Sequence, residues 1–118
     1  MLDLSQRRRQ RQNIQKLPEG VYDSVVTEVR WADGYAPEEA YQITYEITSE
    51  SGNSYRHIEI FKTNARNLRT IEFENYLSDI GLNNISDFVG KHERLTMGYV
   101  TAYNGKEYFN IVDREYVG

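Results

Sequence analysis

One stretch of the chain repeats its apolar residues with the period of an α-helix. Phe73, Leu77 and Ile80 are four and then three residues apart, which places their side chains on one helical face. Gly81 follows and suits the left-handed backbone conformation that ends many helices. The pattern therefore predicts one long helix over residues 67–80, with an apolar face packed on a core.

Three runs before this helix have the period or the composition of β-strands. The run over residues 21–32 is rich in valine and tyrosine, and its alternation changes phase once, which predicts a bulge near Thr27. Residues 41–48 alternate cleanly, which is typical of a strand with one buried face. Residues 54–62 carry apolar side chains on both faces, because isoleucines alternate there with aromatic residues. The sequence therefore predicts three strands ahead of the helix.

Two further strands are predicted after the helix. Residues 95–99 alternate, and residues 106–117 form the last apolar run. The dipeptide Asn104-Gly105 between them is a strong hairpin signal, because it favours a two-residue type I′ turn. A short helical turn or loop is expected at residues 85–89.

This order of elements predicts an all-β fold with one helix. Five strands with a helix between the third and the fourth are typical of the OB-fold, a five-stranded Greek-key β-barrel that often binds oligonucleotides. SH3-like barrels are the second choice, because they lack so long a helix at this position. Pro18 and Gly20 mark a boundary between an arm of residues 1–16 and a domain of residues 17–118.

The composition limits the kinds of protein that this chain can be. It has 118 residues, about one domain, and no cysteine, which excludes disulfides and thiolate metal sites. No apolar run reaches the roughly 20 residues that cross a bilayer, and no apolar stretch follows the N-terminal arginines as it would in a secretion signal. We therefore expect a cytoplasmic protein without a membrane partner.

Charge is distributed unevenly along the chain. The net charge is −4, but residues 1–16 contain five cationic residues and one acidic residue, so 5 − 1 gives +4 for the arm and leaves −8 for the body. A basic arm on an acidic body is typical of a segment that contacts an anionic partner. The alternative is an arm that only increases solubility or lies on its own acidic domain. The cationic residues of the arm are Arg7, Arg8, Arg9, Arg11 and Lys16.

Several stretches together resemble a family of small OB-fold proteins. They are LPEGVY at residues 17–22, the segment 25–31, NYLSDIGL at 75–82, DFVGKHERLTMGY at 87–99 and NGKEYFNIVDREYV at 104–117. In their order and turn placement they resemble the single-strand DNA-binding proteins of phages and integrating elements in Gram-positive-type bacteria. The resemblance implies handling of single-stranded DNA beside replication or recombination proteins.

Little in the sequence indicates catalysis. His57 and His92 are the two histidines, no cysteine is present as a nucleophile, and no glycine-rich phosphate loop follows a strand. His57 and Glu59 form an H-x-E string, which indicates a zinc deaminase only with a downstream cysteine pair that the chain lacks. The prediction is a non-catalytic protein without a metal site or a cofactor.

Binding of single strands requires flat aromatic faces for the bases and positive charge for the phosphates. On the third predicted strand, Tyr55, His57 and Phe61 share one face and Lys62 ends it, with alternate side chains about 7 Å apart. Two points weigh against this strip as a binding surface. Glu59 lies within it and would repel phosphate, and any of these aromatic rings could be buried instead. The first loop and the last hairpin, which flank an OB-fold groove, add Trp31, Tyr35, Tyr103, Lys106 and Tyr108.

Two functional hypotheses remain open at this point. In the first, the aromatic residues stack on single-stranded nucleic acid, with DNA as the expected ligand, and the basic arm follows the phosphates. In the second, the barrel binds proteins or forms a homo-oligomer as an accessory subunit, since an acidic body with exposed tyrosines and strand edges suits a protein interface.

Overall fold

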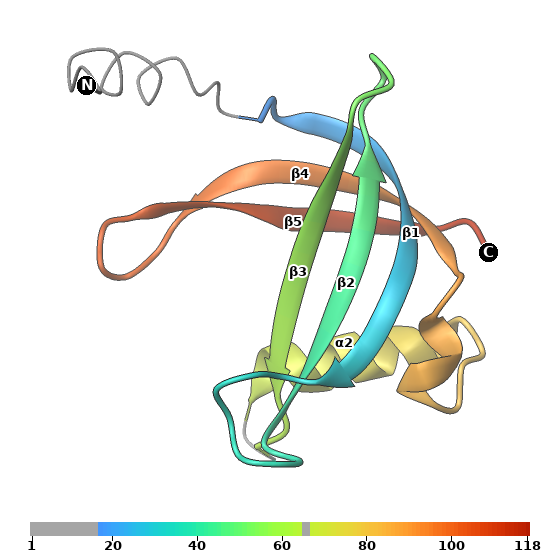
Figure 1. Ribbon diagram of the computed structural model, residues 1–118, viewed down its shortest axis with the longest axis vertical. Helices are drawn as coiled ribbons and strands as arrows, with labels where there is room; N and C mark the ends of the chain where they lie inside the picture. The colour runs from blue at the N-terminus through green and yellow to red at the C-terminus, as the bar shows by residue number, and fades with distance from the viewer. Residues whose placement is uncertain (1–16, 65–66) are drawn as a thin grey trace, which may run out of the picture.

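The computed structural model describes residues 17–64 and 67–118 as one antiparallel sheet with an α-helix and a short 3-10 helix. The order of elements confirms three strands, a helix and two strands (Figure 1). The elements are β1 (Gly20–Trp31), β2 (Ala40–Thr48), β3 (Ser54–Lys62), α2 (Leu68–Asp79), η1 (Ile85–Phe88), β4 (His92–Thr101) and β5 (Glu107–Tyr116).

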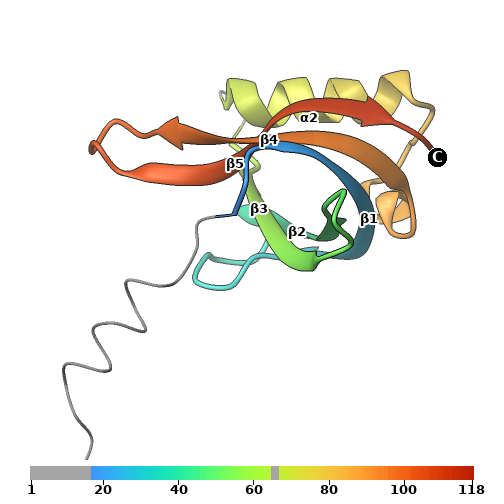
Figure 2. The same ribbon diagram turned by 90° about the horizontal axis from the view of Figure 1, so that it is seen from above.

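The five strands lie in the order β3-β2-β1-β4-β5, so β1 pairs with both β2 and β4. The sheet curls round a central space, as Figure 2 shows from above. β3 and β5 are its two edge strands, and within the described residues no strand pairing joins them. The predicted β-rich, barrel-like fold is therefore confirmed, whereas the closure of the barrel is not.

A bulge in β1 lets one strand serve both halves of the sheet. The register along β2 shifts between Val26 and Glu28, which places the irregularity at the predicted Thr27. Before the bulge, Tyr22, Ser24 and Val26 are buried; after it, the inward position passes to Val29. The phase change in the sequence pattern therefore corresponds to a change in which side chains of β1 point to the core.

Helix α2 lies within the predicted range of residues 67–80, which its two cap residues complete. The Asn67 side chain caps the first turn by accepting a hydrogen bond from the backbone N–H of Thr70, and Gly81 follows the helix at φ 88°. Phe73 and Leu77 are buried and Ile80 packs on the same core. The helix extends from the lower end of β3 to η1 in Figure 1, and it contacts both elements.

Two local predictions are corrected. β2 was expected to bury one face, but Gln42 and Thr44 on its other face are buried too, because side chains of β1 and β3 flank a central strand on both sides. The hairpin at Asn104-Gly105 is present but is not type I′, since of these two residues Gly105 alone has a positive φ. The backbone pairs Ala102 with Lys106, so three residues form the turn.

Candidate functional site

The predicted stacking strip of β3 faces the inside of the curled sheet. In the β2–β3 register Tyr55, His57 and Phe61 lie opposite Ile47, Tyr45 and Tyr41, which are buried. Because opposite residues share a face of the sheet, these three aromatic side chains belong to the core side. The strip predicted as a base-stacking surface is therefore not on the outer surface.

Phe61 shows this correction most clearly. Its ring is 2% exposed and stacks on the Phe73 ring with centroids 4.2 Å apart, while the Arg69 guanidinium lies 4.3 Å from the Phe61 centroid. A base cannot reach this ring without displacing the helix. Tyr55 is half-buried and packs edge-to-face on Tyr22, with ring centroids 6.3 Å apart. Both rings contribute to folding in this structure.

The outer face of β3 carries residues that the sequence interpretation left out of the site. Arg56 is exposed, and Ile58 and Ile60 are exposed at 40% and 36%. Lys62, which was predicted, ends the same row. The signal that the sequence interpretation missed is that Ile58 and Ile60 share one face of the strand with Arg56 and Lys62. Because apolar residues occupy both faces of this strand, alternation alone could not show which face points outward.

The four loop aromatics of the prediction are all exposed. Trp31 ends β1 and is 52% exposed, Tyr35 lies in the loop that follows, and Tyr103 and Tyr108 lie in the β4–β5 hairpin. Tyr103, at the hairpin turn, is fully exposed. Large exposed aromatic side chains are available to stack on a ligand.

Each of these two loop regions also presents a predicted cation. The Lys62 ammonium lies 5.9 Å from the centroid of the Tyr35 ring, within cation–π distance. Lys106 is exposed in the hairpin beside Tyr103. Among the described residues, neither lysine forms an ion pair. The loop after β1 and the hairpin lie apart in both Figures 1 and 2, so the predicted residues form two groups.

Trp31 also borders a groove at the end of β1. The groove has a volume of about 830 Å³, and its walls combine apolar side chains from β1, α2 and the segment around η1 with polar ones. Tyr41, Leu77, Leu82 and Ile85 form much of the apolar wall. The exposed indole ring therefore lies at the edge of a hollow surface.

A buried cluster of charged residues joins the two edge strands. Arg114 of β5 forms ion pairs with Glu59 of β3 and with Glu93 of β4, the latter at 3.1 Å. The Arg114 guanidinium also donates to the Tyr45 hydroxyl at 3.1 Å, and that hydroxyl donates to Glu59 at 2.7 Å. Tyr76 of α2 donates to Glu93 at 2.7 Å. Side chains thus bridge the edges where strand hydrogen bonds do not.

Burial changes the proton affinity of this cluster. It raises the pKa of the Glu93 carboxyl above its ordinary value, although Arg114 and the Tyr76 hydroxyl oppose the shift. Burial also raises the pKa of Tyr45 and Tyr76, so both hydroxyls remain protonated donors at neutral pH. The arrangement is a satisfied structural network, and Arg114 is its central cation.

His57 lies beside this cluster and is expected to make stability depend on pH. Burial lowers its pKa, with Arg114 and Arg69 acting in the same direction and Glu59 opposing, and its Nε2 atom has no partner within the described residues. The imidazole of His57 therefore binds a proton more tightly in the unfolded chain than in the folded one. The contribution of neutral His57 to stability is fully present above the ordinary histidine pKa of about 6.5, and it is lost as the pH falls through the lower pKa of the folded state.

We therefore expect the free energy of unfolding of His57→Phe to decrease less than that of the unmodified chain between about pH 7 and about pH 5. Urea unfolding titrations at several pH values would measure this difference. A variant that keeps the full pH dependence of the unmodified chain would contradict this account.

Residues 17–64 and 67–118 contain no group of three or more histidine or acidic residues placed to hold a metal ion. In these same ranges no helix is both long and apolar enough to span a bilayer. The predicted basic arm lies outside the described residues. Comparison with protein-family models, with curated proteins and with solved structures gave no match.

Proposed function

We propose that the chain is an OB-fold-like, non-catalytic protein that binds single-stranded nucleic acid, DNA in preference to RNA, for a phage or mobile element. The strand order, the helix after β3 and the curled sheet support an OB-fold. The resemblance of the sequence to phage-type single-strand DNA-binding proteins supports the choice of ligand.

One observation carries the proposal: at both loop regions, exposed aromatic rings occur together with lysines that form no ion pair among the described residues. Tyr35 with Lys62, and Tyr103 with Lys106, each offer a flat face for a base and a cation for a phosphate. Such pairs suit a strand whose bases and phosphates alternate. Because the two regions lie apart, we expect one strand to contact them in succession.

The acidic body is the main obstacle to this function. With −8 on residues 17–118, long-range attraction for a polyanion has to come from elsewhere. The five cationic residues of the arm supply it in the proposal. The arm then brings the strand to the domain, and the loop aromatics hold the bases.

Trp31 allows a direct test with the full-length chain, because it is the one tryptophan in the sequence. Addition of an oligo-dT strand at about 50 mM salt should change its fluorescence and saturate. Tyr103→Ala should weaken binding by about 1–3 kcal/mol, the usual contribution of one base stack. Val89→Ala, on an exposed residue after η1, is the matched control and should bind normally. Equal affinities for both variants would remove the hairpin from the site.

A protein-interaction barrel is the second candidate function. The exposed Ile58 and Ile60 on the outer face of β3 favour it, because they are apolar and lie on an edge strand. Light scattering decides whether copies of the chain associate. A monomer at all concentrations, together with saturable oligonucleotide binding, would reject the second candidate.

A further inference from the structure

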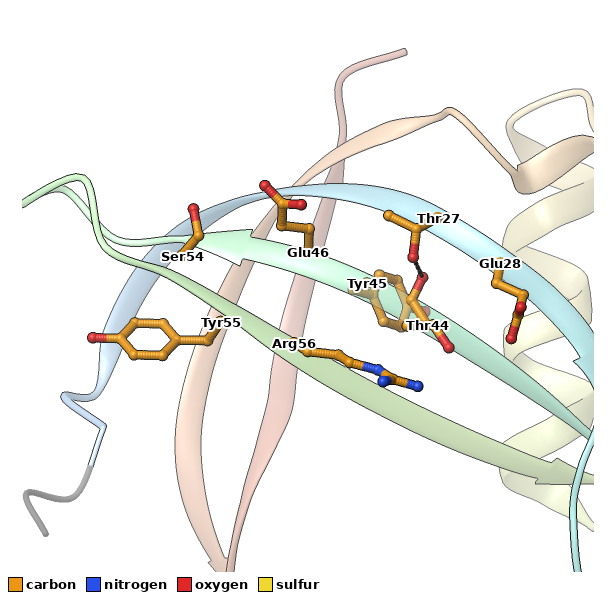
Figure 3. A pocket seen from close by; sticks show the side chains of 8 residues that line it. All are labelled: Thr27, Glu28, Thr44, Tyr45, Glu46, Ser54, Tyr55 and Arg56. Carbon is orange, nitrogen blue, oxygen red and sulfur yellow. Dashed lines mark hydrogen bonds between the residues drawn. The ribbon is translucent and has the colours of Figure 1, made fainter.

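A groove crosses the outer face of β1, β2 and β3, with the side chains shown in Figure 3. Its volume is about 640 Å³, which is within the range of ligand-binding clefts. Two carboxylates and one guanidinium are its charged groups. The residues that line this outer groove are Thr27, Glu28, Thr44, Tyr45, Glu46, Ser54, Tyr55 and Arg56, of which Tyr45 and Tyr55 turn their side chains to the core side of the sheet.

The charges of the outer groove are only partly balanced. Glu28 accepts from Arg30 at 2.8 Å, but Arg30 also pairs with Asp33 at 2.9 Å. Glu46 lies opposite Arg56 in the β2–β3 register, yet among the described residues neither forms an ion pair. Counting these five groups, three carboxylates face two cations, so the surface keeps a net negative charge.

A buried hydroxyl in the same groove lacks a partner. Thr44 is 6% exposed, and its Oγ1 atom has no hydrogen-bond partner within residues 17–64 and 67–118. Its side chain lies between Glu28 and Arg56 in Figure 3. An unpaired buried hydroxyl costs free energy unless a ligand satisfies it. A guanidinium suits this site, because its five N–H donors can reach a hydroxyl and carboxylates together.

The structure also fixes the point from which residues 1–16 start. The Tyr99 hydroxyl donates to the Leu17 carbonyl at 2.7 Å, and the Tyr22 hydroxyl donates to the Pro18 carbonyl. The backbone N–H of Tyr99 donates to the Glu19 carboxylate at 3.0 Å. These bonds hold the end of the arm at the beginning of β1, the strand that carries Glu28 into the groove.

Chain length and charge both match the arm to this groove. Glu28 is eleven residues beyond Leu17, so even a straight strand would place it within about 37 Å, and β1 is curved. Arg7 and Arg9 precede Leu17 by ten and eight residues, which an extended chain spans in about 26–36 Å. The arm carries +4 and the body −8. The arm is therefore long enough, and of the right charge, to reach the groove from Leu17.

We propose that the outer groove binds the arginines of the chain's own arm, residues 1–16, within the same molecule. Guanidinium groups pair with Glu28 and Glu46 and satisfy the Thr44 hydroxyl. The arm then neutralises part of the negative charge on the outer face of the sheet, beside the exposed isoleucines of β3. This contact does not depend on the nucleic-acid function, although phosphates would compete for the same arginines.

Disulfide trapping in the full-length chain tests this proposal, because the sequence has no cysteine of its own. The variant Gln10→Cys/Thr27→Cys places one thiol between Arg9 and Arg11 and one in the groove. With oxidised glutathione and no nucleic acid, it should form an intramolecular disulfide about tenfold faster than Gln10→Cys/Asn75→Cys, whose second thiol lies on the exposed side of α2. Gln10→Cys/Ser54→Cys is a second test pair, should Thr27→Cys disturb the bulge.

Adding Glu28→Gln and Glu46→Gln, or raising the salt to about 1 M, should reduce the rate to that of the Asn75 control. Equal rates of disulfide formation for the groove pair and the control pair would overturn the proposal. So would a rate for the groove pair that stays the same after the two Glu→Gln substitutions and at high salt. Disulfides found only between two molecules would also overturn it, since they would assign the groove to a second copy. None of these results depends on oligonucleotide binding, so failure here leaves the proposed function to its own test.

Discussion

Arg114→Met should lower the free energy of unfolding by about 3–5 kcal/mol, the usual cost of removing one partner from a buried ion pair. The Arg114 side chain is 14% exposed and pairs with Glu59 and Glu93, which are 6% and 1% exposed. Glu59 would keep Arg69, at 3.0 Å, but among the described residues the Glu93 carboxylate would keep only the Tyr76 hydroxyl. A buried carboxylate without a cation then destabilises the fold.

Urea unfolding followed by circular dichroism would measure this loss. Arg94→Met is the matched control, because Arg94 is 54% exposed and its contact with Asp23 is 3.9 Å long. An exposed pair of this kind contributes about 1 kcal/mol or less. Adding Glu93→Gln to Arg114→Met should restore part of the stability by removing the unpaired charge. A loss no larger than that of the control would show that the cluster does not hold the sheet edges together.

Neutralising the arm should have the largest effect on nucleic-acid binding. In Arg7→Gln/Arg8→Gln/Arg9→Gln/Arg11→Gln, up to four phosphate contacts are lost, and the slope of log affinity against log salt should fall by as much as about 2.8. At about 50 mM salt this corresponds to a roughly 10²- to 10³-fold weaker complex with a single strand. The domain itself should still fold, because the substitutions lie outside residues 17–118.

Fluorescence anisotropy of a labelled oligo-dT strand at several salt concentrations would measure the effect. Arg94→Gln serves as control, since it removes one exposed cation of the body. If the arm variant and the control kept the same salt slope, phosphate contacts would have to be assigned to the body, contrary to the proposal.

The local parts of the fold were readable from the sequence because neighbouring residues determine them. The bulge at Thr27 followed from a phase change within a single strand, and the end of the helix followed from Gly81. The hairpin was predicted but its turn type was wrong. Asn104 favours a positive φ without requiring it, and the pairing of Ala102 with Lys106 produced a three-residue turn instead.

The facing of β3 could not be read in the same way. Its two faces carry aromatic and isoleucine residues, so local hydrophobicity is balanced. The choice depends on partners far along the chain: Phe61 stacks on Phe73, and Glu59 meets Arg114. An acidic residue within an aromatic strip was the one hint, since it can be buried when a distant cation pairs with it. The loop aromatics were easier to place, because turn signals on either side kept them outside the core.

The central claim, binding of single-stranded nucleic acid, is tested most directly by anisotropy of a labelled pyrimidine oligonucleotide with the unmodified full-length chain. We predict saturable binding at about 50 mM salt, a much weaker complex at about 200 mM, and a preference for the single strand over the same sequence in a duplex. Absence of binding at about 50 mM salt, where phosphate contacts are strongest, would contradict the account.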